Sequence, residues 1–175
     1  LQISPTSTNA ALTVDPQTAL TRPLVFRACF IDPFQGVAGA AFAYSELGAC
    51  SAFVMYDPDS SYVHDLASAF ETEFRRLGGR IVGRSTYAAD TKDFAGILAE
   101  ASAARPDVLY LPDYFNLVNL VLRQARAFGI AAPFLGGDGW ESPGLDLAAA
   151  EGCYFTAHGS AANPLAEAAS FARAY

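Results

Sequence analysis

From residue 46 onward, the chain alternates short apolar runs with segments whose apolar residues are spaced three and four positions apart. Short runs of this kind are typical of buried strands, and the three-and-four spacing is typical of amphipathic helices. The predicted strands cover residues 52–56, 80–87, 107–111, 133–136 and 153–156, and the predicted helical faces cover 63–77, 94–101, 117–128 and a short segment near 143–150. Strands that alternate with helices through short connections indicate an α/β fold, a doubly wound (Rossmann-like) parallel sheet with helices on both faces.

Turn and capping residues mark the ends of these elements. Gly78-Gly79 is expected to end the first of the four helices, since glycine commonly follows the last helical turn. Asp90 or Thr91 is expected to cap the second helix, because a short polar side chain can accept a hydrogen bond from a free amide of the first turn.

The N-terminal part of the chain follows a different pattern. Residues 33–47 predict a further helix that precedes the first strand and packs on the same sheet, whereas residues 1–30 do not continue the alternation. Residues 1–3 have the pattern of the end of a strand, and residues 171–175 that of an unfinished amphipathic helix. We therefore interpret the chain as an excised piece of a larger protein, with residues 1–30 belonging to a neighbouring layer.

Composition narrows the function classes. A chain of 175 residues is long enough for one well-packed domain, or for one domain and pieces of a second. Its formal net charge of −7 disfavours nucleic acid and anionic membrane surfaces as partners, because both attract clustered Lys and Arg. No apolar run approaches the ~18 residues of a membrane-spanning helix, so no membrane insertion is predicted.

Cysteine usage gives little further information. Cys29, Cys50 and Cys153 are too few for a disulfide framework and contain no CxxC pair. Buried thiols that behave as small hydrophobic side chains are the expectation. One disulfide is possible in an oxidising compartment, and the sequence does not indicate which pair would form it.

Candidate site residues lie in the loops that follow the predicted strands. In open parallel sheets, ligands bind beyond the carboxyl ends of the strands. These loops present Tyr62, Tyr114, Asp138 and Trp140 at one edge, and two phenols, an indole and a carboxylate suit a small molecule that carries a positive charge. Each residue also has a purely structural interpretation: the tyrosines would cover a helix turn and a sheet edge, and Asp138 would stabilise a glycine-flanked turn.

Motifs of enzymes and metal sites are absent. The sequence contains no GxGxxG, GxxxxGK[ST] or GxSxG pattern. His64 and His158 are not spaced as metal ligands, so surface or packing roles are expected for both. Sequence spacing alone leaves a catalytic carboxylate pair open, and nothing points to one. We predict no catalytic residue, no metal and no cofactor.

A series of short motifs runs along the chain: Ile3-Ser-Pro-Thr-Ser-Thr-Asn9, Leu12-Thr13, Phe26-Arg27, Asp32, Gln35-Gly36, Tyr62, Leu77-Gly78-Gly79, Asp93-Phe94, Pro106-Asp107, Arg123 to Arg126, Gly129 and Gly136-Gly-Asp-Gly139. These motifs resemble the type I periplasmic binding proteins, in particular the branched-chain amino acid (leucine/isoleucine/valine) binding proteins. They span the whole chain in the order of the family. Each match is weak alone, and the ordered set is specific.

The resemblance implies two α/β lobes that close on a ligand. Residues 1–30 would be a remnant of the first lobe, residues 31–158 the second lobe, and residues 159–175 the return into the first. By the same resemblance, Thr8 would hold a ligand carboxylate through its hydroxyl and amide, and Thr6 would add a backbone contact. Asp138 would bind an α-ammonium, while Tyr62 and Tyr114 would cover the ligand, with Trp140 as a possible further pocket residue.

The function implied by the resemblance is the substrate-binding component of an ABC importer. Such a protein would capture an amino acid or similar zwitterion and deliver it to a membrane permease, either in the periplasm or outside the cell on a lipid anchor. The alternative is a ligand-sensing regulator or chemoreceptor domain on the same fold. An enzyme of doubly wound fold is a third possibility, which no motif supports.

Overall fold

A five-stranded parallel sheet forms the centre of the protein, in a computed structural model that describes residues 1–160 and 165–174. Its strands are β3 (Ser51–Tyr56), β4 (Arg80–Thr86), β5 (Val108–Tyr110), β6 (Phe134–Gly136) and β7 (Tyr154–Phe155). They lie in the order β4-β3-β5-β6-β7, and every pair is parallel. The predicted α/β class and the five predicted strands are confirmed.

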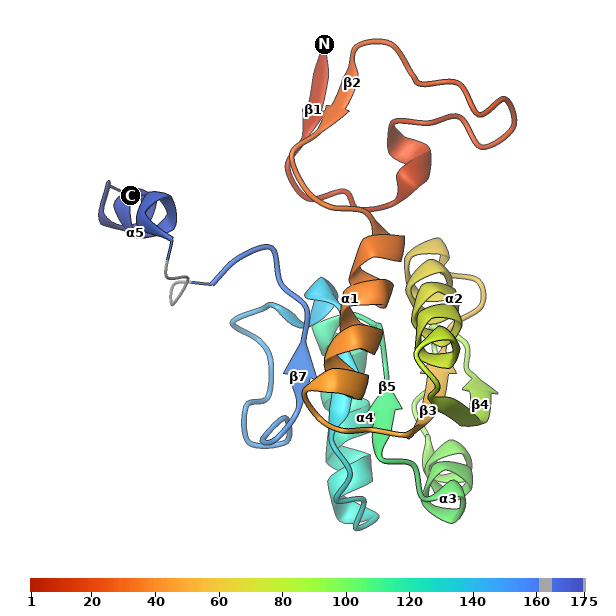
Figure 1. The fold of residues 1–175 in the computed structure, drawn as a ribbon. Coiled ribbons are helices and arrows are strands. Elements are labelled where there is room, and N and C mark those ends of the chain that lie inside the picture. Colours follow the sequence, from red (N-terminus) through yellow and green to blue (C-terminus); the bar gives the residue numbers. More distant parts are fainter. Residues whose placement is uncertain (161–164, 175) are drawn as a thin grey trace.

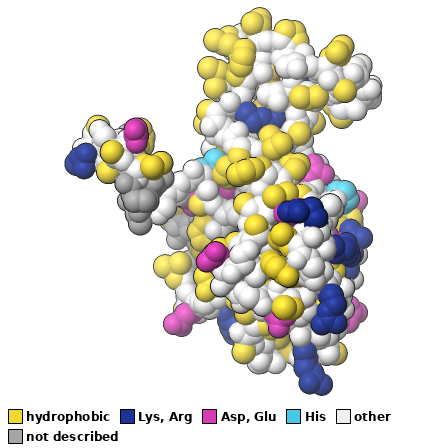
Figure 2. All heavy atoms as spheres, in the orientation of Figure 1, with side chains coloured by type: hydrophobic (Ala, Val, Ile, Leu, Met, Phe, Trp, Pro, Cys, Tyr) yellow, Lys and Arg dark blue, Asp and Glu magenta, His cyan; other side chains and the backbone are white. Residues whose placement is uncertain are grey.

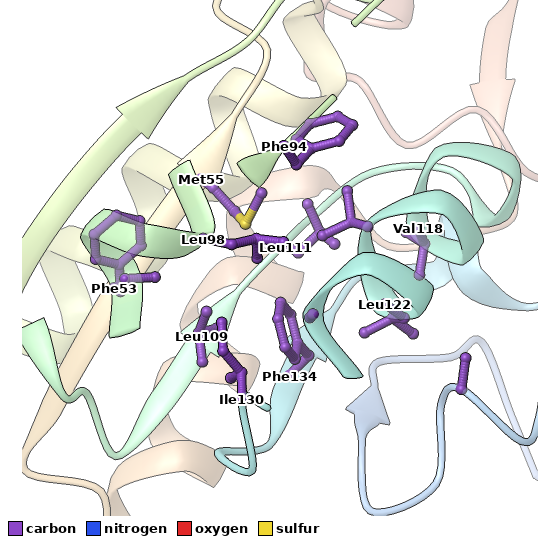
Figure 3. Packing of buried hydrophobic residues seen from close by; sticks show 14 of the residues in the cluster. Phe53, Met55, Phe94, Leu98, Leu109, Leu111, Val118, Leu122, Ile130 and Phe134 are labelled. Atoms are coloured by element: carbon purple, nitrogen blue, oxygen red, sulfur yellow. The ribbon is translucent and has the colours of Figure 1, made fainter. Parts of the chain in front are cut away.

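Two helices cover each face of this sheet (Figure 1). One face carries α1 (Asp32–Ser45) and α2 (Ser61–Arg76), and the other carries α3 (Ala95–Ala104) and α4 (Phe115–Ala127). Side chains alternate between the faces along β3: Val54 packs with α1 and α2, and Met55 packs with α3 and α4. Figure 3 shows this second cluster, in which Phe53, Met55 and Leu109 meet the helical residues. The sheet is therefore doubly wound, as predicted.

The predicted end of α2 is confirmed, and the predicted cap of α3 is wrong. Gly78 follows α2 with a φ of 101°, a left-handed conformation that favours glycine. α3 begins at Ala95, and the residue before it makes no side-chain cap. The Thr91 hydroxyl instead accepts a hydrogen bond from the Ala88 amide (3.1 Å), which stabilises the turn before the helix.

The prediction of a short helix near residues 143–150 is also wrong. This segment forms turns, which polar side chains hold against α4. The Asn119 side chain accepts from the Asp146 amide (2.8 Å) and donates to the Gly144 carbonyl (2.8 Å). Arg123 Nε donates to Asp146 Oδ2 (2.6 Å). These contacts satisfy part of the backbone from outside, and the segment itself adds only isolated turn bonds such as Ala150 amide to Asp146 carbonyl (2.9 Å).

The N-terminal segment forms a separate small sheet. β1 (Gln2–Ser4) pairs in parallel with β2 (Val25–Arg27), and the connection contains a 3₁₀ turn, η1 (Ala10–Leu12). Figure 1 shows this segment at one end of the molecule, beyond the start of α1, whereas the last helix, α5 (Ala166–Ala174), lies apart from the central sheet. No helix among the described residues has the length and apolar character to span a membrane.

The cysteines differ from the expectation of buried thiols. All three are free, so the optional disulfide is not formed. Cys29 and Cys153 are partly buried, and Cys50 is exposed at the start of β3, where its amide donates to Asp107 Oδ2 (3.0 Å).

Candidate functional site

A cavity of about 680 Å³ lies between the N-terminal segment and the carboxyl ends of three strands of the central sheet. The N-terminal segment contributes residues 6–9, and the segments that follow β3, β5 and β6 contribute Tyr62 in the first turn of α2, Tyr114 and Asp138. β4 and β5 flank β3 on opposite sides, so the strand order reverses here, where open parallel sheets bind ligands. The cavity thus brings together all five predicted ligand-binding residues, Thr6 and Thr8 included.

Arg27 at the end of β2 shapes the loop that carries Thr6 and Thr8. Its guanidinium donates to the carbonyl oxygens of Ser7 (2.9 Å) and Asn9 (2.9 Å) and to the Thr13 hydroxyl (2.9 Å). The planar guanidinium offers donors in a fixed geometry, so it can hold several carbonyls of one loop at once. The loop's carbonyls are therefore engaged on the side of Arg27.

Two amides of this loop, those of Thr6 and Thr8, are left available. The Thr8 carbonyl accepts from the Asp32 amide (3.1 Å), and the Ser7 amide donates to the Ser4 hydroxyl (3.0 Å). Within the described part of the chain, neither the Thr6 nor the Thr8 amide donates to another residue. Two free amides in a loop that lines a cavity are suited to a carboxylate, which accepts hydrogen bonds through both of its oxygens.

Asp138 faces the same cavity from η2 (Asp138–Trp140), the 3₁₀ turn after β6. Its Oδ1 accepts from the Tyr62 hydroxyl (2.7 Å) and from Gln35 Nε2 (2.9 Å), and its amide donates to Gln35 Oε1 (3.0 Å). Gln35 also accepts from the Thr156 hydroxyl (2.7 Å). The carboxylate is thereby fixed through one oxygen, and Oδ2 takes no part in these bonds.

The two tyrosines form an aromatic wall beside Asp138. The Tyr62 and Tyr114 rings stack with their centres 5.0 Å apart; Tyr62 is buried, and Tyr114 is 51% exposed. Burial raises the pKa of the Tyr62 hydroxyl, and the adjacent Asp138 raises it further, so it stays protonated and keeps donating. Asp113 holds the backbone of Tyr114 by accepting from its amide (2.6 Å).

Trp140 is not a pocket residue, which corrects the prediction. Its side chain is fully buried in the core, and its indole N–H donates to the Leu111 carbonyl (3.0 Å). The indole occupies the space beside Gly136, where a β-carbon would lie 2.1 Å from Nε1. The indole ring therefore fills the space that a side chain at position 136 would occupy, and Trp140 supports the η2 turn from the side of the core.

His158 is a cavity residue that the sequence did not reveal. Its Nδ1 lies 3.6 Å from Asp138 Oδ2, and its ring stacks on Phe30, with ring centres 4.2 Å apart and an interplanar angle of 16°. The expected packing role accounts for the contact of His158 with Phe30, but not for its position beside Asp138. No spacing rule links residues 138 and 158, because the pair forms only when the turns between β6 and β7 fold back.

Asp32 is a second unforeseen feature. It is fully buried at the start of α1, and neither carboxylate oxygen has a hydrogen-bond partner among the described residues. Burial raises its pKa to about 6, and the nearby Thr8 hydroxyl offsets only part of that effect. The described residues contain no group of three or more His, Cys, Asp or Glu side chains that could hold a metal ion.

Comparison with known proteins gives a consistent result. A family model described as periplasmic binding protein matches residues 4–175. An amino acid binding protein from Pseudomonas aeruginosa is 28% identical over 139 residues, which are 79% of this chain and 36% of that protein. A Leu/Ile/Val/Thr-binding protein from Salmonella typhimurium is 27% identical over 151 residues, which are 86% of this chain and 40% of that protein.

Solved structures agree. A leucine binding protein from Thermotoga maritima is 34% identical, with a TM-score of 0.82, and the match covers 99% of this chain and 49% of that chain. A branched-chain amino acid transporter substrate binding protein from Streptococcus pneumoniae, in complex with isoleucine, is 28% identical, with a TM-score of 0.80 and the same coverage. The chain thus spans about half the length, or less, of the proteins it matches.

Proposed function

Since the chain belongs to the periplasmic binding protein family, we propose that it is the ligand-gripping part of a receptor that closes two hinged lobes on a free amino acid. In this proposal residues 31–158 are the second lobe, residues 1–30 belong to the first lobe, and residues 159–175 return to it. The role is binding without turnover.

One observation carries the proposal: donors for a carboxylate and an acceptor for an ammonium line the same cavity. The free amides of Thr6 and Thr8 lie on the N-terminal segment, and the Asp138 carboxylate lies on the central domain. A zwitterion would connect the two, because its carboxylate and its α-ammonium need partners of opposite kind. The Tyr62–Tyr114 stack supplies an apolar wall for the ligand side chain.

Relatives support the class of ligand and the partner. The matched Salmonella typhimurium protein is named for leucine, isoleucine, valine and threonine, the matched Thermotoga maritima protein is named for leucine, and the matched Streptococcus pneumoniae structure contains isoleucine. We therefore expect leucine, isoleucine or valine as ligand and the permease of an ABC importer as partner. The receptor would act in the periplasm, or outside the cell on a lipid anchor.

The test is a calorimetric titration of the two-lobed protein with leucine, isoleucine, valine and an acidic and a basic amino acid. We expect one site per protein, with the branched-chain amino acids bound most tightly. Absence of binding to any amino acid would contradict the proposal. Tight binding together with a failure to support uptake in membrane vesicles that contain the permease would favour a sensing role instead.

A further inference from the structure

Three residues from separate segments meet beside the cavity, and two of them, Asp138 and His158, line it. Phe30 lies just before α1, Asp138 lies on η2, and His158 follows β7. The imidazole is held between the other two: its face stacks on Phe30 at 4.2 Å, and its Nδ1 lies 3.6 Å from Asp138 Oδ2. The other Asp138 oxygen is already bonded to Tyr62 and Gln35, so Oδ2 is the oxygen left for a ligand.

We propose that His158 is a specificity-determining residue that sets the charge the cavity accepts, an inference that rests on the amino acid receptor proposed above. Neutral His158 leaves Asp138 Oδ2 open to a ligand ammonium and offers its own ring nitrogen as a second acceptor. Protonated His158 is itself the cation beside Oδ2, and the ligand ammonium must then compete with it.

The geometry fits a shared cation. The His158 ring nitrogen and Asp138 Oδ2 are 3.6 Å apart, which is longer than a direct hydrogen bond and leaves room for one donor to reach both atoms. The stack on Phe30 fixes the ring plane, so the nitrogen keeps its position when a ligand binds. The His158 side chain is 31% exposed and can exchange protons with solvent.

The surrounding charges are negative. Glu141 beyond η2 lines the same cavity, the Asp32 carboxyl on α1 interacts electrostatically with Asp138 and with Asp65 from α2, and the Tyr62 and Tyr114 hydroxyls lie on the aromatic side. The nearest cation of the N-terminal segment, Arg27, is occupied by loop carbonyls. Histidine side chains gain a proton as the pH falls from about 7.5 to 5, so competition for Asp138 Oδ2 grows over that range.

The experiment measures the affinity of the two-lobed protein for L-leucine by calorimetry between about pH 5 and pH 7.5, where the free amino acid keeps both charges. We expect affinity to fall about tenfold from the upper to the lower pH. His158→Gln keeps a polar side chain of similar reach that does not titrate, so the difference should shrink to less than about twofold.

Two controls separate other sources of the effect. His64 is the only other histidine in the sequence and lies 48% exposed on α2, so His64→Gln should retain the tenfold difference. Asp32 titrates in the same range, so Asp32→Asn is measured in parallel. If the pH dependence persists in His158→Gln, the inference is overturned, and its loss in Asp32→Asn would then identify Asp32 as the source. If leucine binds neither the unsubstituted protein nor His158→Gln at pH 7.5, the proposed function itself is overturned.

Discussion

At the scale of single residues, we expect Asp138 to combine a structural and a binding role through its two oxygens. Oδ1 accepts from the Tyr62 hydroxyl and from Gln35, which ties η2 to α1 and α2. Oδ2 faces the cavity near His158. A substitution that keeps an acceptor for the two donors and removes the charge should therefore separate the roles.

Asp138→Asn is such a substitution. Its carbonyl oxygen can accept from Tyr62 and Gln35, so we expect the melting temperature without ligand to change little. A ligand ammonium would lose a charged partner in a closed cleft, where deleting one partner of a buried pair removes about 2 to 5 kcal/mol. Amino acid affinity of the two-lobed protein should then fall at least about 30-fold. A lower melting temperature with unchanged affinity would instead identify Asp138 as a turn-stabilising residue only.

Asp32 makes a prediction about stability and pH. Its folded-state pKa of about 6 lies above the ordinary value of 3.8, because burial disfavours the carboxylate. Between these values the folded protein holds a proton that the unfolded chain has released. Its contribution is thus most favourable below pH 3.8 and declines as the pH rises through about 6.

The measurable consequence is a change on the order of 2 to 3 kcal/mol in the free energy of unfolding across that range, from Asp32 alone. Asp32→Asn cannot ionise, so it should be more stable than the unsubstituted protein at pH 7.5 and similar to it at about pH 4. Urea unfolding at the two pH values checks this expectation. Equal stability of the two proteins at both values would show that the carboxylate is better solvated than its burial indicates.

At the scale of elements, the contact between α1 and α2 depends on one glycine. A β-carbon at Gly36 would lie 2.7 Å from both the Ala69 β-carbon and the Leu66 carbonyl oxygen, and the second of these is backbone that cannot turn away. Gly39, one turn later in the same helix, has only ordinary contacts at 3.7 Å and beyond. The close approach of α2 therefore excludes a β-carbon at Gly36 but not at Gly39.

Gly36→Ala and Gly39→Ala form a matched pair. Replacing glycine by alanine at either position should stabilise the helix by about 1 kcal/mol through helix propensity. At Gly36 the helices must separate, and overpacking of this kind destabilises by about 1 to 3 kcal/mol. We expect Gly36→Ala to lower the unfolding midpoint in urea and Gly39→Ala to leave it unchanged or raise it. Equal effects of the two substitutions would contradict the assigned close approach.

The elements of the central domain were predictable because local pattern and tertiary role agree there. The apolar run of β3 is buried on both faces, and α2 and α4 each carry one apolar stripe toward the sheet. The segment 143–150 has a helical composition, but side chains of α4, more than twenty residues earlier, hold it as turns. Periodicity contains no information about such distant hydrogen bonds.

The site was predictable to a similar degree. Tyr62, Tyr114 and Asp138 could be found because each follows a strand, and parallel strands bring their carboxyl ends to one edge. The expectation for Trp140 failed because loop position does not reveal that an adjacent glycine leaves a space for its ring. Gln35 and His158 depend on contacts across 103 and 20 residues, which only the folded chain creates.

At the scale of the whole molecule, the N-terminal segment is too small to be stable alone. Its sheet has two strands of three residues each, and sheets of that size are marginal in water. Large apolar side chains remain exposed on it, namely Leu1, Ile3, Leu20, Leu24 and Phe26, and Figure 2 shows apolar atoms gathered over this end of the molecule. In the proposed receptor, the remainder of the first lobe covers this surface.

The last prediction follows from that arrangement. In the proposed receptor, residues 1–175 would contain the Asp138 side of the cavity and a small part of the opposite lobe, so they could not close two complete lobes on the ligand. Loss of about half of the contacts should remove several kcal/mol and lower affinity on the order of 100-fold or more relative to the two-lobed protein. The exposed apolar surface should also promote association of the isolated chain.

Calorimetry of both proteins with L-leucine at the same pH measures the difference in affinity, and sedimentation velocity measures association. The Tyr62 and Asp138 hydrogen bonds lie wholly within the central domain, so the isolated chain should keep its fold and the cavity wall around Asp138. Circular dichroism with cooperative thermal unfolding is therefore the control for folding. A folded chain that binds leucine as tightly as the two-lobed protein would show that residues 1–175 form a complete site, and that closure by a second lobe contributes no affinity.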